Sequence, residues 1–217
     1  GGIPIIRPLS QCLAANEILE IYGILNGTTN YILTRMIRSG LTFDAALKEA
    51  QDNGYAERDP SADVEGHDAC RKICILADIA FGRHISPEQV PTQGITDVNL
   101  ADVDYAESAG KKIKLLGRAI HREDGRVCAY VALHLVDQSD PLAGVEDVFN
   151  AISVRGDAIG DVMFYGRGAG KLPTASAVVA DVIDVARNMG SRKALSWEPG
   201  GEDTACGTDD LASRWYV

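Results

Sequence analysis

Apolar and polar positions follow one another in an order that places helices early in the chain and strands late. Residues 18–25 alternate, are rich in branched side chains and predict a strand. A polar turn at residues 26–30 then opens a helix over about residues 31–39, with Gly40 as its stop signal. Four further helices are expected, over residues 42–54, 63–81, 100–108 and 175–187, with short helical turns between 86 and 92.

The later apolar runs predict antiparallel pairs of strands. Residues 113–120 and 127–136 flank Glu123-Asp124-Gly125, a strong hairpin signal. Residues 148–154 and 161–165 form a second pair, joined through residues 156–160. This order predicts an α+β fold of α/β type: one open, mixed but largely antiparallel sheet with helices on one face. The other face would then be free to pair with a second copy of the chain.

Composition narrows the class of protein. The chain has 217 residues, 46% hydrophobic and 24% charged, enough for one core and a small appendage. A net charge of -10 argues against nucleic-acid partners, and we read the one basic cluster, Lys111, Lys112 and Lys114, as a solvated face. Because no apolar run has bilayer length and the first residues lack a signal-peptide pattern, we expect a cytoplasmic protein without membrane partners.

The cysteines do not indicate a metal site. Five of them, at positions 12, 70, 74, 128 and 206, show no Cys-x-x-Cys spacing, and their odd number predicts reduced thiols. Cys70 and Cys74 lie one helical turn apart beside apolar residues, so we expect them in the core.

Residues 54–72, GYAERDPSADVEGHDACRK, are dense in acidic side chains and form the main candidate site. Asp63 is placed to cap a helix, which puts Asp68 and Lys72 on one face near its start. Glu57 lies in the loop upstream and could fold back towards that pair. Carboxylates beside an amine can bind an amino-acid-like substrate and move a proton. The alternative is an ordinary surface ion pair; for His67, a helix-surface role is expected.

Two turns at helix starts are weaker candidates. The turn at residues 26–30 leaves backbone N–H groups and the hydroxyls of Thr28 and Thr29 at a helix start, where small polar ligands bind. Simple helix capping is the alternative. The glycine-rich stretch at 166–170 precedes another helix, but no acidic residue follows at the spacing of a dinucleotide fingerprint.

The chain resembles the catalytic domain of the homoserine dehydrogenase family over nearly all of residues 1–189. The resemblance is carried by residues 54–72, by GILNGTTNYILTRM at 23–36, by YGRGAGKLPTASAVVADV at 165–182 and by the opening GGIPIIRPL. It implies the interconversion of L-homoserine and L-aspartate 4-semialdehyde with NAD or NADP, a step in threonine, methionine and isoleucine biosynthesis. It also implies a homodimer.

The resemblance assigns roles by position. Lys72 matches the family's acid/base residue, and with Asp68 and Glu57 it makes up the catalytic set. Five positions match substrate-binding residues: Glu57, Asp68, Asp63, Tyr55 and Thr28. Three match glycines that the cofactor approaches closely: Gly54, Gly168 and Gly170. Gly1 and Ile3 match backbone ligands of a sodium ion, whose other ligands would precede residue 1.

The resemblance also implies the domain organisation. Residues 1–189 would be the catalytic, substrate-binding and dimerisation domain, and residues 190–217 a linker and the start of an ACT-type regulatory domain. The family's N-terminal Rossmann domain is absent from this chain, so we expect the excised middle of a longer enzyme, inactive alone. The alternative is a self-associating module that binds substrate or a partner without chemistry.

Overall fold

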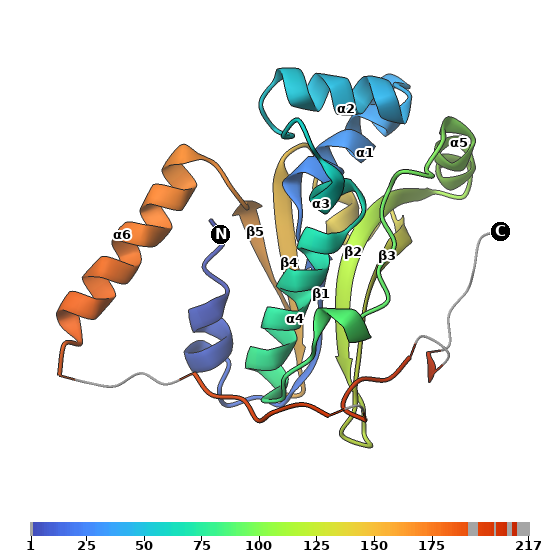
Figure 1. The fold of residues 1–217 in the computed structure, drawn as a ribbon. Coiled ribbons are helices and arrows are strands. Elements are labelled where there is room, and N and C mark those ends of the chain that lie inside the picture. Colours follow the sequence, from blue (N-terminus) through green and yellow to red (C-terminus); the bar gives the residue numbers. More distant parts are fainter. Residues whose placement is uncertain (1, 191–194, 202, 208–209, 212–217) are drawn as a thin grey trace.

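The fold is one antiparallel sheet with helices on one face, in a computed structural model that describes residues 2–190, 195–201, 203–207 and 210–211 (Figure 1). The sheet has the strand order β3-β2-β1-β4-β5, and every neighbouring pair is antiparallel. Its strands are β1 (Ile18–Ile24), β2 (Lys111–His121), β3 (Val127–Asp137), β4 (Phe149–Gly156) and β5 (Gly160–Arg167). This arrangement confirms the expected fold class.

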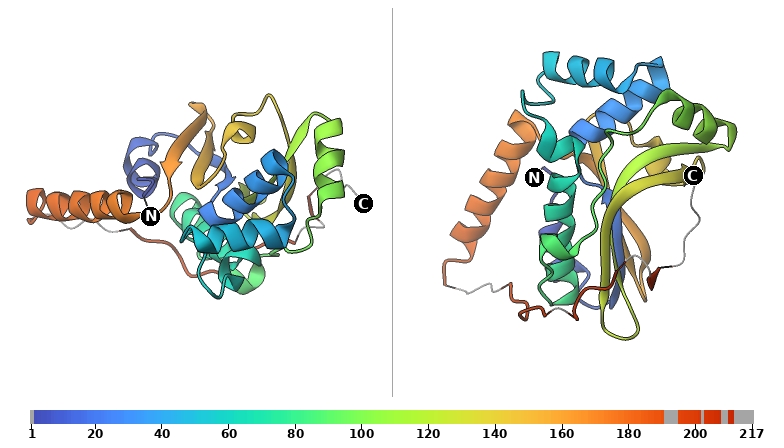
Figure 2. Two further views of the ribbon diagram at one scale, coloured as in Figure 1. Left: turned by 90° about the horizontal axis from the view of Figure 1, so that it is seen from above. Right: turned by 45° about the vertical axis from the view of Figure 1, so that its right-hand side comes forward.

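Six α-helices and three short turns complete the described fold. The helices are α1 (Gly27–Ser39), α2 (Phe43–Asp52), α3 (Ser61–Val64), α4 (His67–Phe81), α5 (Leu100–Ser108) and α6 (Lys171–Arg187). The short turns are η1 (Pro8–Cys12), η2 (Pro87–Gln89) and η3 (Pro141–Gly144). Helices α1 and α4 lie against the sheet, and α2 packs on the outer side of α1 (Figure 2).

The core lies between the sheet and this helical layer. Ile21 of β1 packs with Ile32, Met36 and Ile73 from the helices, and none of the four is exposed to solvent. Burying a side chain of this size stabilises the fold by about 2 kcal/mol. Gly117 of β2 lets α4 come close, because a Cβ there would lie 3.3 Å from the Cβ of Ile73.

The opposite face of the sheet is open and polar at its centre. Glu20 of β1 is buried between two guanidinium groups, 2.5 Å from Arg118 Nε and 3.0 Å from Arg155 Nη1. A hollow of about 280 Å³ lies over this triad, and His134 lines it too. Burial lowers the pKa of His134, so the face carries a neutral imidazole near pH 7.

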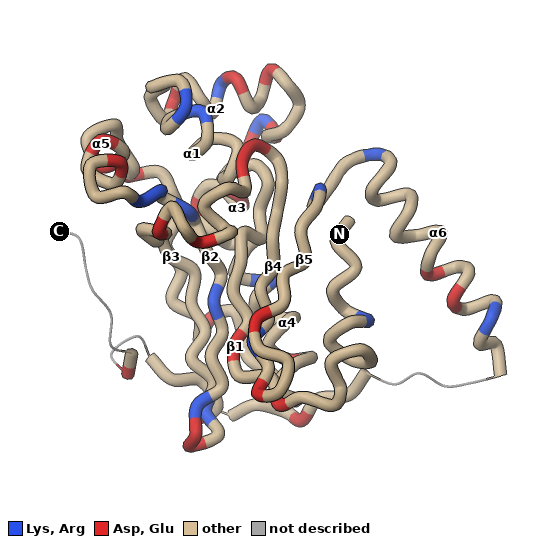
Figure 3. The backbone as a smooth tube through the Cα atoms, turned by 180° about the vertical axis from the view of Figure 1, so that it is seen from behind, with Lys and Arg blue, Asp and Glu red and all other residues tan. Residues whose placement is uncertain are grey.

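Helix α6 projects from the β5 side of the molecule in every view of Figures 1 and 2. It has no buried residue, and Leu172, Val178 and Val182 are strongly exposed. Its charged residues are few, as Figure 3 shows, and Asp181 pairs with Arg7 at 2.9 Å. None of the described helices, α6 included, combines the length and apolar character needed to cross a bilayer.

The expected helix over residues 63–81 is wrong in one respect. The chain breaks it at Gly66, whose φ of 86° lies in the left-handed region, so that α3 and α4 are separate helices. Asp63 therefore lies inside α3 and caps nothing. A Cβ on Gly66 would also lie 3.0 Å from the carbonyl oxygen of Gln93, so the break is built into the packing.

Lys114 corrects the reading of the basic cluster as a solvated face. Its side chain is 1% exposed, and Nζ donates to Asn30 Oδ1 at 3.1 Å and to the carbonyl of Val145. Burial lowers the pKa of Lys114 to about 8. Alternation along β2 places this residue on the side that the turn η3 covers, which the strand pattern alone did not reveal.

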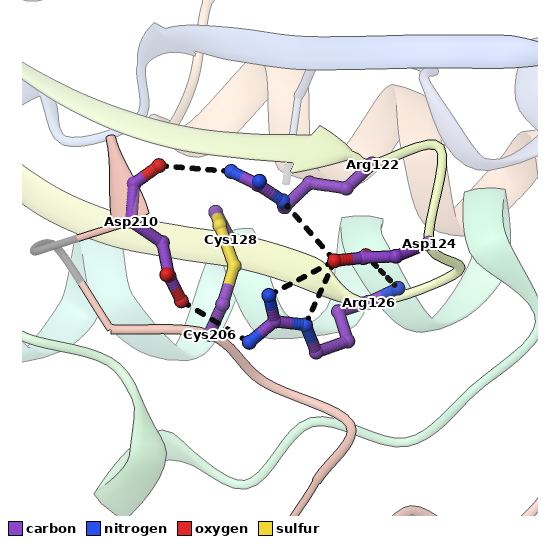
Figure 4. Close-up of a disulfide and its surroundings, with 6 residues drawn as sticks. All are labelled: Arg122, Asp124, Arg126, Cys128, Cys206 and Asp210. Carbon is purple, nitrogen blue, oxygen red and sulfur yellow. Dashed lines mark hydrogen bonds and ion pairs between the residues drawn. A yellow bond between two sulfur atoms is a disulfide. The ribbon is translucent and has the colours of Figure 1, made fainter. Parts of the chain in front are cut away.

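The structure also corrects the expectation of reduced thiols. Cys128 at the start of β3 forms a disulfide with Cys206, while Cys12, Cys70 and Cys74 are free (Figure 4). The segment around Cys206 runs beside β3: Cys206 N–H donates to the carbonyl of Val127 at 3.0 Å. Cys70 and Cys74 are buried, as expected.

Candidate active site

The candidate site lies where β1 ends and α1 begins. Asn26 caps α1: its Oδ1 accepts a hydrogen bond from the N–H of Thr29 at 2.9 Å. The polar turn predicted at residues 26–30 is thus the first turn of the helix, which begins at Gly27 rather than near residue 31. Gly27 has to be small, because a Cβ there would lie 2.9 Å from the carbonyl oxygen of Val148.

Two carboxylates meet at the other end of the Asn26 side chain. Its Nδ2 donates to Asp63 Oδ1 at 2.7 Å and to Asp68 Oδ2 at 2.8 Å. Asp63 comes from α3 and Asp68 from the first turn of α4, where the helix dipole favours a negative charge. The break at Gly66 therefore lets two short segments present their acids to one point.

Lys72 completes the cluster one turn further along α4. Its Nζ lies 2.6 Å from Asp68 Oδ2 and 3.1 Å from the carbonyl oxygen of Leu25, which accepts a hydrogen bond from it. The side chain of Lys72 is 46% exposed and that of Asp68 is 31% exposed, so both reach water. An amine held this way can bind a substrate and still exchange protons with solvent.

The loop after α2 borders the cluster. Thr28 Oγ1 donates to the carbonyl oxygen of Tyr55 at 2.8 Å, and the Tyr55 ring packs on the ring of Tyr31, with centroids 4.9 Å apart. Gly54 enables the turn with a φ of 73°. Thr28, in the first turn of α1, is therefore tied to the loop that carries Tyr55; both residues are predicted substrate contacts.

Glu57 does not join the cluster in this structure. Its side chain is exposed, and within the described residues its carboxylate makes no hydrogen bond or ion pair. Its backbone carbonyl accepts a hydrogen bond from Gln51 Nε2 at 3.1 Å, which holds the loop to the end of α2. The expectation that Glu57 folds back onto Asp68 and Lys72 is thus not met here. His67 is exposed and paired with Glu65 at 3.1 Å, as expected for a helix surface.

The glycine loop at 166–170 reaches the same end of the sheet and joins β5 to α6. A Cβ on Gly168 would lie 2.5 Å from Asn150 Nδ2, and Gly170 has a φ of 124°. Asn150 is 6% exposed, and its Oδ1 is buried without a hydrogen-bond partner within the described part of the chain. A Cβ on Gly27 would lie 3.3 Å from that oxygen, so Asn150 connects the loop to the start of α1.

Two features of this arrangement suit a bound polar group. The buried amide oxygen of Asn150 has no partner within the described residues, which costs about 1–3 kcal/mol unless a ligand or water satisfies it, and Gly27 and Gly168 keep side chains away from it. The sodium site has less support: Gly1 lies outside the described residues, and the Ile3 carbonyl accepts the N–H of Ile5 at 2.9 Å. The described residues also contain no cluster of acidic, histidine and cysteine side chains suited to a metal.

Sequence reasoning missed two of the residues that organise this site. Asn26 was read as part of a turn, and its bridge between two acids depends on the break at Gly66. Asn150 lies in an apolar strand and carries no pattern of its own; its only signal is that a polar amide stands where β4 faces the core.

Comparisons with known proteins agree with the motifs. Residues 4–183 match the homoserine dehydrogenase family. The chain is 52% identical over 189 residues to a homoserine dehydrogenase of Synechocystis, covering 85% of this chain and 43% of that protein. It is 44% identical over 225 residues to one of Neisseria gonorrhoeae, covering 100% of this chain and 51% of that protein. The chain thus spans about half the length of the curated relatives it matches.

Solved structures give the same result. A homoserine dehydrogenase from Thiobacillus denitrificans superposes with a TM-score of 0.90 at 42% identity, over 97% of this chain and 50% of that one. A hyperthermophilic archaeal homoserine dehydrogenase mutant in complex with NADPH superposes with a TM-score of 0.71 at 33% identity, over 86% of this chain and 53% of that one. On fold, family match and identity together, the chain belongs to the homoserine dehydrogenase family.

Proposed function

We propose that this chain is the catalytic and substrate-binding domain of a homoserine dehydrogenase, which interconverts L-homoserine and L-aspartate 4-semialdehyde with NAD(P). The observation that carries the proposal is the gathering of Asp63, Asp68 and Lys72 at the start of α1, on the same end of the sheet as the glycine loop. In the cell, this reaction would serve threonine, methionine and isoleucine biosynthesis in the cytoplasm.

The two aspartates and the residues around them would bind the substrate. Asp68 and Asp63 each have one carboxylate oxygen that accepts no hydrogen bond within the described residues, and these oxygens suit the ammonium group of homoserine. Thr28 and Tyr55 would limit the space around the substrate, and Glu57 would reach it by turning inward from the rim. This assignment gives a role to all five predicted substrate residues, with Glu57 acting from the rim.

Lys72 would move the proton. In oxidation it takes the hydroxyl proton of homoserine, and in reduction it returns that proton to the carbonyl oxygen; such catalysis contributes about 10²–10⁴-fold to the rate. Asp68 and the Leu25 carbonyl hold the amine in place for both directions. Its partial exposure supplies a route for the proton to water.

Gly54, Gly168 and Gly170 would allow the cofactor to approach the backbone closely. The nicotinamide, when bound, accepts or supplies the hydride. The family uses NAD(P), and the archaeal relative above is in complex with NADPH. The free oxygen of Asn150 offers an acceptor beside the loop, and the Ile3 carbonyl remains a candidate sodium ligand at the start of the domain.

The uncovered surfaces suit the domain plan expected for residues 1–189. The apolar side chains of α6 would pack on a separate cofactor-binding domain, and the open sheet face around Glu20 would pair with a second copy. Residues 190–210 would act as a linker. The segment at 212–217, expected to start a regulatory domain, lies outside the described residues. A binding module without chemistry is not favoured, since the similar proteins are named as dehydrogenases.

The test uses the full-length enzyme that contains this chain. Lys72→Ala should abolish homoserine-dependent reduction of NAD(P)⁺ while leaving NAD(P)H affinity nearly unchanged, because the amine acts on the substrate proton. The matched control is Arg71→Ala, an exposed neighbour on α4 that should keep wild-type turnover. A Lys72→Ala enzyme with most of its rate would remove this residue from the mechanism.

A further inference from the structure

Asn26 uses both ends of its side-chain amide, and only one of these uses belongs to helix capping. Its Oδ1 accepts the Thr29 N–H at 2.9 Å, which any good N-cap residue can do. Its Nδ2 makes two further hydrogen bonds, at 2.7 Å to Asp63 and at 2.8 Å to Asp68. The residue is 6% exposed, so these bonds are largely shielded from water and hold a fixed geometry.

The bridge joins two acids that would otherwise repel each other. One oxygen of Asp63 and one of Asp68 lie within hydrogen-bond distance of the same nitrogen, although they belong to two helices that the left-handed residue Gly66 separates. Two close carboxylates disfavour each other's charged form. An amide N–H₂ between them offsets this repulsion and ties α3 to the first turn of α4.

The bridge also sets the direction of the remaining oxygens. Asp68 Oδ2 accepts from both Asn26 Nδ2 and Lys72 Nζ, so Asp68 Oδ1, which has no hydrogen bond among the described residues, can face a ligand. The preceding residue, Leu25, holds Lys72 through its carbonyl oxygen at 3.1 Å. Two consecutive residues, Leu25 and Asn26, thus orient both acids and the amine.

We propose that Asn26 is the positioning residue of this site: its amide aims Asp63 and Asp68 at the substrate ammonium and keeps Asp68 against Lys72. Asn26 itself contacts no reacting atom. The inference rests on the proposed function, because the groups it orients are those assigned to homoserine.

Two substitutions in the full-length enzyme separate bridging from capping. Asn26→Ser keeps an N-cap oxygen but loses both donors, and Asn26→Asp keeps the cap but places a third carboxylate against the other two. Asn26→Ser should lower kcat/KM for homoserine by about a hundredfold, since misplacement by about 1 Å costs that much. The Kd of NAD(P)H, measured by fluorescence titration, should stay at the wild-type value.

Asn26→Asp tests the two donors by a second route. Its side chain keeps the N-cap oxygen but has no N–H to donate, and a third carboxylate beside Asp63 and Asp68 adds to their repulsion. The value of kcat/KM for homoserine should therefore fall at least as far as in Asn26→Ser, with the Kd of NAD(P)H again at the wild-type value. Thermal unfolding of both variants checks that the cap is kept, and Asn26→Gly is the substitute should Asn26→Ser fail to fold.

Three results would overturn the positioning role of Asn26. Wild-type kcat/KM in Asn26→Ser would make Asn26 a cap and nothing more, and wild-type kcat/KM in Asn26→Asp would show that Asp63 and Asp68 need no N–H donor between them. Either result overturns the positioning role while the proposed function stands. A wild-type enzyme that binds NAD(P)H but fails to oxidise homoserine would overturn both.

Discussion

The two halves of the candidate site differ in how far the chain completes them by itself. In the acid and amine half, Asn26, Asp63, Asp68 and Lys72 hold one another through hydrogen bonds of 2.6–2.8 Å. In the glycine-loop half, Asn150 has a buried oxygen without a partner in the part of the chain that the structure describes, and α6 leaves the loop with its apolar side chains in water.

The substrate half is completed when this chain folds, whereas the cofactor half has groups that a binding partner would have to cover. The substrate half is preorganised, since its polar groups have partners before any ligand arrives. The cofactor half carries an unsatisfied polar atom and an uncovered apolar helix. Both are unfavourable in free energy, and a bound cofactor or a second domain can offset them. We therefore expect changes in the first half to act on turnover and changes in the second to act on cofactor affinity and assembly.

The largest expected effect on ligand binding is in the glycine loop. Gly168→Ala places a methyl group 2.5 Å from Asn150 Nδ2, so the loop must shift away from the start of α1. We expect the Kd of NAD(P)H in the full-length enzyme to rise by roughly a hundredfold, by the same positional argument as for catalytic groups. Fluorescence titration measures it.

The matched control lies two residues away. Gly166→Ala meets only Ile3 Cγ1 at 3.9 Å, an ordinary van der Waals contact, and should bind the cofactor as the wild type does. Equal losses in both variants would mean that the loop tolerates no side chain anywhere, and the special place of Asn150 would be lost.

The next effect concerns stability and comes from Lys114, whose buried amine donates to Asn30 of α1. Burial lowers the pKa of Lys114 to about 8 from 10.5, so the unfolded chain binds one more proton than the folded chain between these pH values. The free energy of unfolding must therefore rise with pH across this window, by about 3 kcal/mol from this group. Below about pH 8 that contribution is absent.

Lys114→Met removes the titrating group and should remove this rise. Urea unfolding at both ends of the window, with Lys111→Met as the exposed control on the same strand, isolates the difference. An identical pH dependence in wild type and Lys114→Met would show that the amine is hydrated. The Lys114 amine would then not act as a buried contact of α1.

A smaller effect is expected on α6. In the 217-residue chain Val182 is 63% exposed, so Val182→Asp should change its stability by no more than about 0.5 kcal/mol. If α6 packs on the proposed cofactor-binding domain, the same substitution in the full-length enzyme would bury a charge there and cost about 2 kcal/mol or more. Thermal unfolding of both proteins makes the comparison, and equal small shifts would leave α6 uncovered.

Local patterns predicted the elements well because each element carries its own signal. Helix α5 begins at Leu100 and ends at Ser108, as expected, and the hairpin of β2 and β3 turns at the Glu123-Asp124-Gly125 signal. The pair Asp68 and Lys72 was predicted from helical spacing, which fixes a shared face whatever the rest of the chain does.

What the patterns missed depends on contacts between distant segments. Asn26 meets Asp63 only after the chain breaks at Gly66, and Cys206 meets Cys128 across 78 positions. Lys114 is covered by the turn η3, and nothing in the sequence of β2 indicates this burial. Such pairings are set by tertiary packing, so a one-dimensional pattern does not contain them.

The smallest effect tests the border between the two halves. The Glu57 carboxylate has no partner within the described residues, so Glu57→Gln should change the free energy of unfolding by less than about 0.5 kcal/mol. If Glu57 turns inward onto the substrate ammonium, losing its charge should raise KM for homoserine by about tenfold, as one charge-assisted hydrogen bond is worth about 1.5 kcal/mol or more. Steady-state kinetics at saturating NAD(P)⁺ measure KM. An unchanged KM would leave Glu57 on the rim and confine substrate binding to the acids that Asn26 already holds.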